Sequence, residues 1–129
     1  NDASEDPVAV ALGFLGAPYL WGGNSCFGLD CSGLVQASML ACGVSCPGDS
    51  DQQAARLGAE LRPDAAPARG DVSFWEGHVG LLSTPETLLH ATAHAMAVIE
   101  EPLREAVARI ERREGKPVQC RRRVSLPPG

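Results

Sequence analysis

The apolar residues of this chain change their spacing once, close to Asp71, and this change restricts the fold more than any other feature. Before it, they recur every three or four positions over 7–14 and 31–42, a spacing that predicts two helices. After it, they alternate in short runs that predict strands. The predicted strands are 72–75, 78–82 and 87–91. Helices that come first and strands that follow are typical of an α+β fold with an antiparallel sheet.

Weaker patterns predict three further elements. Residues 95–99 and 117–124 have the alternation of strands, and we place the second at an edge of the sheet. Residues 102–114 form an amphipathic helix in which Leu103, Ala106, Val107 and Ile110 share a face. With 129 residues the chain has the length of one domain with its own core. We therefore expect a single domain over 1–129, with a flexible lead (1–6), a core (7–124) and a tail (125–129).

Charge and hydropathy exclude some functions. The net charge of −5 argues against nucleic acid as a partner, and we read Arg121–Arg123 as part of a solvated edge strand. No apolar run approaches the roughly 20 residues that span a bilayer, so we expect no membrane span. The first residues also lack the basic and apolar regions of a signal peptide.

The five cysteines are Cys26, Cys31, Cys42, Cys46 and Cys120. An odd number cannot all pair within one chain, so at least one is free. A zinc site is disfavoured because the four closest cysteines would have to bind across a predicted helix. We expect Cys42, Cys46 and Cys120 to be small buried apolar residues.

Cys31 stands at the start of the predicted helix 31–42, with Asp30 as its N-cap and Gly43 as its stop. Unpaired N–H groups and the dipole at a helix start favour an anion, which lowers the pKa of a thiol. The carboxylate of Asp30 acts in the opposite direction. By spacing alone, a nucleophile and a buried structural cysteine are equally well supported.

The histidines favour the nucleophile. If 83–86 is the turn of a hairpin, His78 lies opposite residue 90 or 91, which brings His78 and His90 together on one face. A catalytic base and its orienting partner need this arrangement. His94 lies about four residues further along the strand and reads as a rim residue. A two-histidine metal site lacks a carboxylate as third ligand, so we expect no metal.

Five segments, in this order and spacing, resemble the NlpC/P60 family over roughly residues 7–110. The segments are Pro18-Tyr19-Leu20-Trp21-Gly22-Gly23, Gly28-Leu29-Asp30-Cys31-Ser32-Gly33-Leu34-Val35-Gln36, Arg69-Gly70-Asp71-Val72-Ser73-Phe74-Trp75, Gly77-His78-Val79-Gly80 and Leu89-His90-Ala91. The resemblance implies a papain-like fold and a cysteine peptidase that cuts bacterial cell-wall peptides. The bond implied joins γ-D-glutamate to a diamino acid such as meso-diaminopimelate or lysine, and no cofactor is implied.

The resemblance also assigns roles by position. It makes Cys31 the nucleophile, His78 the general base and His90 the group that orients His78. Tyr19 lines the site and helps to hold the oxyanion, whereas Trp21 lies beside the substrate mainly as a packing residue.

The resemblance extends to members that release L-Ala-γ-D-Glu from free stem peptides of peptidoglycan, which are the partners we expect. In these members the positions of Asp30, Ser32 and Ser50 bind the free amino group of the substrate. A role for Asp30 as a helix cap alone is equally well supported. Two features depart from these members: this chain has no bacterial SH3-like domains, and Gly48 stands where an arginine often follows the proline.

Two other functions remain open from the sequence. The same cysteine and histidines would serve an amidase or acyltransferase with a non-wall substrate. A wall-binding module with a dead site is the non-enzymatic alternative, which the intact Cys31, His78 and His90 argue against. A reactive thiol and several unpaired cysteines favour the cytoplasm slightly over the periplasm or cell envelope.

Overall fold

The computed structural model describes residues 6–19, 24–25 and 28–125, and it has the expected α+β class. The elements are α1 (Pro7–Leu12), β1 (Asn24–Ser25), β2 (Gly28–Leu29), α2 (Cys31–Ala41), α3 (Ser50–Arg56), β3 (Ala59–Glu60), β4 (Val72–Trp75), β5 (His78–Thr84), β6 (Thr87–Thr92), β7 (Ala97–Pro102), α4 (Leu103–Glu114) and β8 (Cys120–Arg123). No helix within the described ranges has the length and apolar character needed to cross a bilayer.

Most strands form one antiparallel sheet with the order β3-β8-β4-β5-β6-β7, and β1 and β2 form a small hairpin of their own. The strand predicted at 117–124 is present as β8, but the prediction that it lies at an edge is wrong. It pairs with β4 on one side and with β3 on the other. β3 has only two residues, too few to produce an alternating pattern in the sequence.

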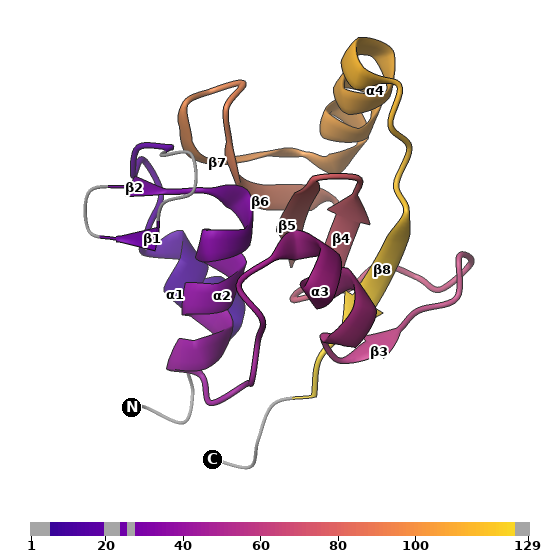
Figure 1. Cartoon of the computed structure of the whole chain (residues 1–129). Helices are drawn as coiled ribbons and strands as arrows, with labels where there is room; N and C mark the ends of the chain where they lie inside the picture. Colours follow the sequence, from indigo (N-terminus) through magenta and orange to yellow (C-terminus); the bar gives the residue numbers. More distant parts are fainter. Residues whose placement is uncertain (1–5, 20–23, 26–27, 126–129) are drawn as a thin grey trace.

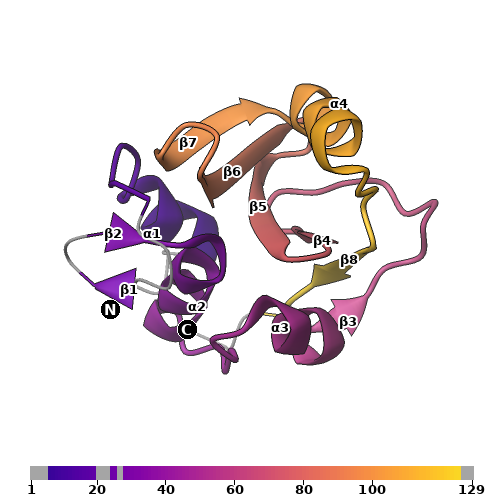
Figure 2. The same cartoon turned by 45° about the horizontal axis from the view of Figure 1, so that its top comes forward.

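The sheet is covered by helices on both faces (Figure 1). It curves around the side occupied by α1 and α2, while α4 lies outside the curve next to β6 and β7 (Figure 2). The core under α1 and α2 includes the fully buried Val8, Leu34, Val35 and Met39. A second cluster under α4 is built from Trp75, Leu82, Leu88, Ala106 and Ile110.

Two leucines that fit the helical spacing lie outside the core. Leu15 follows the end of α1 at Leu12 and is 45% exposed, and Leu40 in the last turn of α2 is 54% exposed. Leu40 lies within the predicted helix 31–42, and Leu15 directly follows the predicted helix 7–14. Both lie close to the end of a helix, which leaves their side chains at the surface.

The arginine run of β8 is not a solvated edge. Arg122 donates to the carbonyl oxygens of Leu57 and Ala54, and its side chain is only 11% exposed. Arg123 forms an ion pair with the buried carboxylate of Asp71. Arg121 donates to three carbonyls of the loop before β4, those of Arg62, Pro63 and Ala65. The run therefore fastens neighbouring loops to the sheet.

Candidate active site

The local sequence fixes where α2 begins. Asp30 has an extended backbone, and its Oδ1 accepts a hydrogen bond from the amide of Gly33 at 2.7 Å. This side chain takes one of the four amide donors that a helix start leaves unpaired. Cys31 is consequently the first residue of α2, as the sequence predicted.

A tight hairpin fixes His78 at the start of β5. Trp75 and His78 are a residue pair of β4 and β5, with only Glu76 and Gly77 between them. Gly77 has a φ of 77°, a conformation that glycine adopts without strain. The rings of Trp75 and His78 lie 5.6 Å apart, which restricts the imidazole.

His78 and His90 meet as predicted, but through a different register. Leu81 pairs with Leu89, and continuing this ladder sets His90 opposite Gly80 rather than opposite His78. A side chain on residue 80 would occupy the space in front of His90, since a Cβ there would lie 2.9 Å from the His90 Cβ. The two imidazoles therefore meet diagonally across Gly80, with His78 Nε2 2.7 Å from His90 Nδ1.

Two further residues extend this contact, and the sequence did not reveal either of them. The second ring nitrogen of the fully buried His90, Nε2, lies 2.6 Å from Oε2 of Glu101 on β7. Arg109 on α4 binds both oxygens of that carboxylate, at 2.6 and 2.8 Å. Glu101 pairs with Leu88 and Ile99 pairs with His90, so Glu101 lies on the same face of the sheet as His90, and only this parity could have indicated it.

The charges in this chain of contacts follow from burial and hydrogen bonding. Burial, with His90 adding to it, lowers the pKa of His78 to about 3. Burial also lowers the pKa of His90, although its hydrogen bond to Glu101 opposes the shift. The hydrogen bond from Arg109 lowers the pKa of Glu101 to about 2. Near neutral pH the site thus holds two uncharged imidazoles beside one ionised carboxylate.

Cys31 is buried, and its thiol points to the carbonyl oxygen of Gly77, 4.0 Å away. Burial raises the pKa of the Cys31 thiol; the Val79 amide acts against this rise, and the charge of Asp30 adds to it. The amides of Cys31 and Ser32 at the helix start lower this pKa, as expected, but the loss of solvent outweighs them. These shifts keep both the Cys31 thiol and the His78 imidazole uncharged near neutral pH.

This charge state predicts the pH dependence of thiol alkylation. Iodoacetamide reacts with the thiolate, so the rate for Cys31 should keep rising with pH from about pH 6 to beyond pH 9, without a plateau at neutral pH. Labelling is followed by mass spectrometry of the peptide that carries Cys31, with a Cys31→Ala protein as the blank. A rate that is already constant at pH 6 would instead indicate a thiolate–imidazolium pair.

Cys31 lies where two clefts meet. Tyr19, Cys31 and Gly77 line both of them. One, of about 330 Å³, is completed by Asp30, Ser32, Gly48, Asp49 and Ser50, and we call it the acidic cleft. The other, of about 500 Å³, is completed by His78, Thr92, Ala93, His94, Arg109, Ile110, Arg113, Glu114 and Lys116, and we call it the basic cleft.

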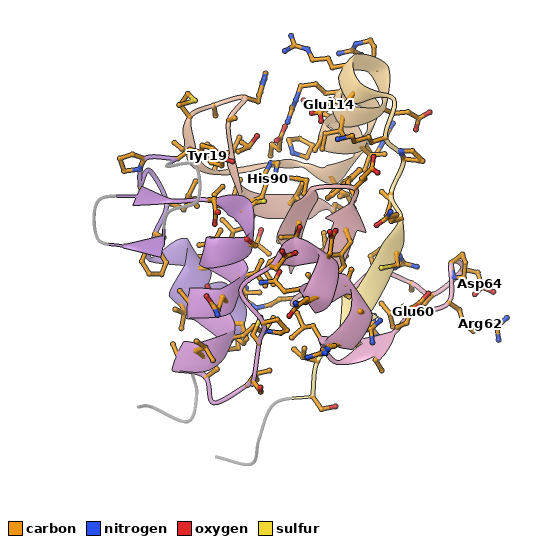
Figure 3. The ribbon with its side chains drawn as sticks, viewed as in Figure 1. Tyr19, Glu60, Arg62, Asp64, His90 and Glu114 are labelled. Carbon is orange, nitrogen blue, oxygen red and sulfur yellow. The ribbon has the colours of Figure 1, made fainter. Side chains whose placement is uncertain are left out.

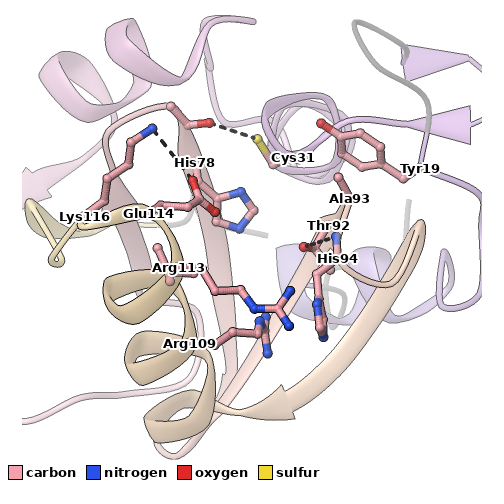
Figure 4. Close-up of a pocket in the computed structure, with 12 residues that line it drawn as sticks. Tyr19, Cys31, His78, Thr92, Ala93, His94, Arg109, Arg113, Glu114 and Lys116 are labelled. Carbon is pink, nitrogen blue, oxygen red and sulfur yellow. Dashed lines mark hydrogen bonds and ion pairs between the residues drawn. The ribbon is translucent and has the colours of Figure 1, made fainter.

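The side chains around the basic cleft come from three parts of the fold (Figure 4). Arg109 and Arg113 extend from α4 towards the end of β6, where His94 forms part of the exposed rim. Tyr19 and His90 lie towards the same part of the molecule as Glu114, whereas Glu60, Arg62 and Asp64 project from the β3 edge, away from the clefts (Figure 3).

The acidic cleft brings together three residues that the resemblance grouped: Asp30, Ser32 and Ser50. The buried Gln53 holds the Ser50 segment against the start of α2, because its amide donates to the carbonyls of Ser32 and Pro47 at 3.1 and 2.7 Å. These three residues are therefore beside the thiol rather than scattered over the surface.

The remaining candidates have different outcomes. Tyr19 lines both clefts, and burial raises the pKa of its hydroxyl, with the charges of Cys31 and Asp30 adding to the rise. Trp21 lies outside the described residues. Cys42 and Cys46 are buried as predicted, whereas Cys120 is only partly buried. Within the described ranges, no group of three or more His, Cys, Asp or Glu side chains is arranged to hold a metal ion.

Known proteins that are similar to this chain include several peptidases. Residues 16–112 match the NlpC/P60 family. A gamma-D-glutamyl-L-lysine dipeptidyl-peptidase of Bacillus subtilis is 41% identical over 96 residues, which are 68% of this chain and 32% of the relative. Dipeptidyl-peptidase 6 of Lysinibacillus sphaericus is 35% identical over 88 residues, with the same two coverages. The chain thus spans about a third of the length of these curated relatives.

Solved structures agree with the fold. The crystal structure of an NlpC/P60 family protein from Bacillus cereus covers 98% of this chain and 41% of its own, with 28% identity and a TM-score of 0.79. RipD of Mycobacterium tuberculosis, described as a non-catalytic NlpC/p60 domain protein, covers 97% of this chain and 99% of its own. Its TM-score is 0.72 at 23% identity, a likeness that shows the fold alone.

Proposed function

The chain belongs to the NlpC/P60 family, and we propose that it is a cysteine peptidase domain, over 1–129, that hydrolyses stem peptides of the bacterial cell wall. The bond we propose is the one between γ-D-glutamate and diaminopimelate or lysine. One observation carries the proposal. Cys31, at a helix start, lines the same cleft as His78, and the ring of His78 is hydrogen-bonded to His90. A nucleophile, a base and a group that orients the base are the parts that acyl transfer to sulfur requires.

The proposed reaction uses these groups in two stages. Nδ1 of His78 accepts the thiol proton of Cys31 while the sulfur bonds to the γ-glutamyl carbonyl carbon. Amide groups at the start of α2 and the hydroxyl of Tyr19 donate to the oxyanion. His78 then gives the proton to the leaving amine, and the C–N bond breaks. In the second stage His78 takes a proton from water as the water oxygen bonds to the thioester carbon. The C–S bond then breaks, the acyl part leaves as a carboxylic acid, and His78 returns the proton to the sulfur of Cys31.

The charges of the two clefts give the substrate one orientation. Asp30, with Ser32 and Ser50, offers a carboxylate and two hydroxyls to the free amino group of L-Ala in the acyl part. The basic cleft, with Arg113 and Lys116, faces the leaving diamino acid, which carries carboxylates. A peptide whose amine and carboxylates occupy these clefts has its γ-amide bond next to Cys31.

The test is a peptide assay with product identification. L-Ala-γ-D-Glu-meso-diaminopimelate is incubated with the protein, and release of L-Ala-D-Glu is followed by mass spectrometry; the α-linked isomer serves as the control. We expect release from the γ-linked peptide only. If the peptide binds by calorimetry but no product forms, the protein is a wall-binding module. Equal cleavage of both isomers would contradict the proposed bond specificity.

Asp30 allows the amine-binding role to be separated from capping. Asparagine caps a helix about as well as aspartate but carries no charge, so Asp30→Asn should keep the thermal midpoint of the protein. A hydrogen bond to a charged group contributes about 1.5–3 kcal/mol, so kcat/KM for the free tripeptide should fall roughly 10- to 100-fold. The N-acetylated peptide should be cut equally slowly by both proteins. If Asp30 only caps the helix, wild type will cut free and acetylated peptides alike.

A further inference from the structure

We propose that Glu101 and Arg109 are positioning residues that fix the proton of His90 on Nε2 and thereby leave Nδ1 of His78 unprotonated to accept the proton of Cys31. The inference rests on the proposed function for its consequence in catalysis. Its structural basis is independent of any substrate: an unbroken series of short contacts runs from Arg109 through Glu101 and His90 to His78.

The direction of each hydrogen bond follows from the last acceptor in the series. Arg109 donates to both oxygens of Glu101, which keeps this carboxylate ionised and therefore an acceptor only. At 2.6 Å, His90 Nε2 must donate to Glu101 Oε2, because a lone pair there would face another lone pair. A neutral His90 has one ring proton, so its Nδ1 is an acceptor.

The same reasoning assigns the proton of His78. Its Nε2 lies 2.7 Å from the acceptor Nδ1 of His90, so Nε2 carries the hydrogen. A neutral His78 then has its lone pair on Nδ1. His78 lines the basic cleft together with Cys31, which makes this lone pair available to the thiol.

The reverse arrangement would disable the base. With its proton on Nδ1, His90 would donate to His78 Nε2, and His78 would carry its own proton on Nδ1. That nitrogen would then have no lone pair for the thiol proton. The positions of the two rings fit both arrangements of the protons equally well. Only the ionised Glu101, which must accept a hydrogen bond from His90 Nε2, selects the first arrangement. Arg109 contributes by keeping both carboxylate oxygens in place, so that neither can rotate away from His90.

The test combines a tautomer measurement with kinetics. In Glu101→Gln the two carboxylate oxygens are replaced by one amide oxygen and one NH2 group. Arg109 then attracts the single oxygen with its two donors, so that the NH2 group turns towards His90 Nε2. We expect kcat/KM to fall about 100-fold, less than the roughly 10⁴-fold loss when the wrong tautomer is presented directly in a serine-protease triad. Glu111→Gln, an exposed change on α4, is the matched control and should retain wild-type rates.

Ring ¹⁵N spectra of histidine-labelled protein read the tautomers directly. The chain has three histidines, and His94→Gln identifies the exposed one. We expect wild-type His78 to carry its proton on Nε2, and Glu101→Gln to place part of the population on Nδ1. The double variant Glu101→Gln/Arg109→Met also removes the guanidinium that attracts the amide oxygen. That oxygen can then accept from His90 Nε2, and kcat/KM should be at least tenfold higher than in the single variant.

Three results would overturn the inference. One is a wild-type His78 with its proton on Nδ1. Another is a Glu101→Gln protein that loses activity while both tautomers stay unchanged, which would indicate a structural role. The third is a double variant less active than the single one. Failure of the peptidase proposal is distinguishable, because the spectra and the alkylation rate of Cys31 require no peptide substrate.

Discussion

Cys31→Ala is expected to lower kcat/KM for the γ-linked tripeptide on the order of 10⁵-fold. The sulfur is the only proposed group that forms a covalent bond with the substrate, and loss of a protease nucleophile costs about 10⁶-fold in a well-studied serine enzyme. The fold should be retained, because alanine keeps the Cβ of Cys31 and the N-cap by Asp30 is made with the Gly33 amide. Turnover is measured by product release under saturating and subsaturating peptide.

The control for this variant is Cys120→Ala. Cys120 is a partly buried cysteine on β8 that lines neither cleft, and its replacement should leave kcat/KM within about twofold of wild type. Equal rates for wild type and Cys31→Ala would refute the cysteine mechanism even if the protein cuts the peptide.

Gly80→Ala should remove most activity through a single methyl group. The added Cβ would lie 2.8 Å from Leu88 Cδ1 and 2.9 Å from His90 Cβ, so both neighbours must move. Overpacking of this kind costs about 1–3 kcal/mol of unfolding free energy. Because His90 would shift relative to His78, we expect a loss in kcat/KM of at least about 100-fold, as for small misplacements of catalytic groups.

Leu88→Ala separates the two effects of Gly80→Ala. Leu88 is fully buried in the cluster under α4, and a leucine-to-alanine change in a core costs about 2–5 kcal/mol. Leu88→Ala should therefore lower the free energy of unfolding, measured with urea, at least as much as Gly80→Ala does. The folded fraction of Leu88→Ala should keep a kcat/KM within about threefold of wild type. If both variants lose activity in proportion to stability, Gly80 has no specific role at the histidine contact.

The start of α2 and the pairing of the histidines could be predicted because they depend on local rules. Asp30 is a capping residue directly before Cys31, and its hydrogen bond spans three residues. His78 and His90 have the same parity on neighbouring strands, so a slip of the register by two residues keeps them on one face. The register itself shifts at an irregularity between Leu82 and Thr84, and no residue type in this segment predicts that shift.

The features that the sequence did not predict depend on tertiary packing. Glu101 and Arg109 reach His90 only because β7 lies beside β6 and α4 folds back over both. The raised pKa of Cys31 has the same origin, since the burial of its sulfur depends on surrounding segments far apart in the chain. Arg122 was misjudged for a related reason: its acceptors, the carbonyls of Ala54 and Leu57, lie more than sixty residues before it.

The position of Cys31 between the two clefts has a consequence for the order of events in turnover. In the proposed reaction, the acyl part would stay attached in the acidic cleft once the thioester forms, whereas the diamino acid would be held in the basic cleft without a covalent bond. The proposed peptidase would therefore empty one side of its site before water enters there, which is a ping-pong sequence. Accumulated diamino acid would compete with that water for the same space, and its amine would attack the thioester and re-form the amide bond. The peptidase would therefore slow as its first product builds up.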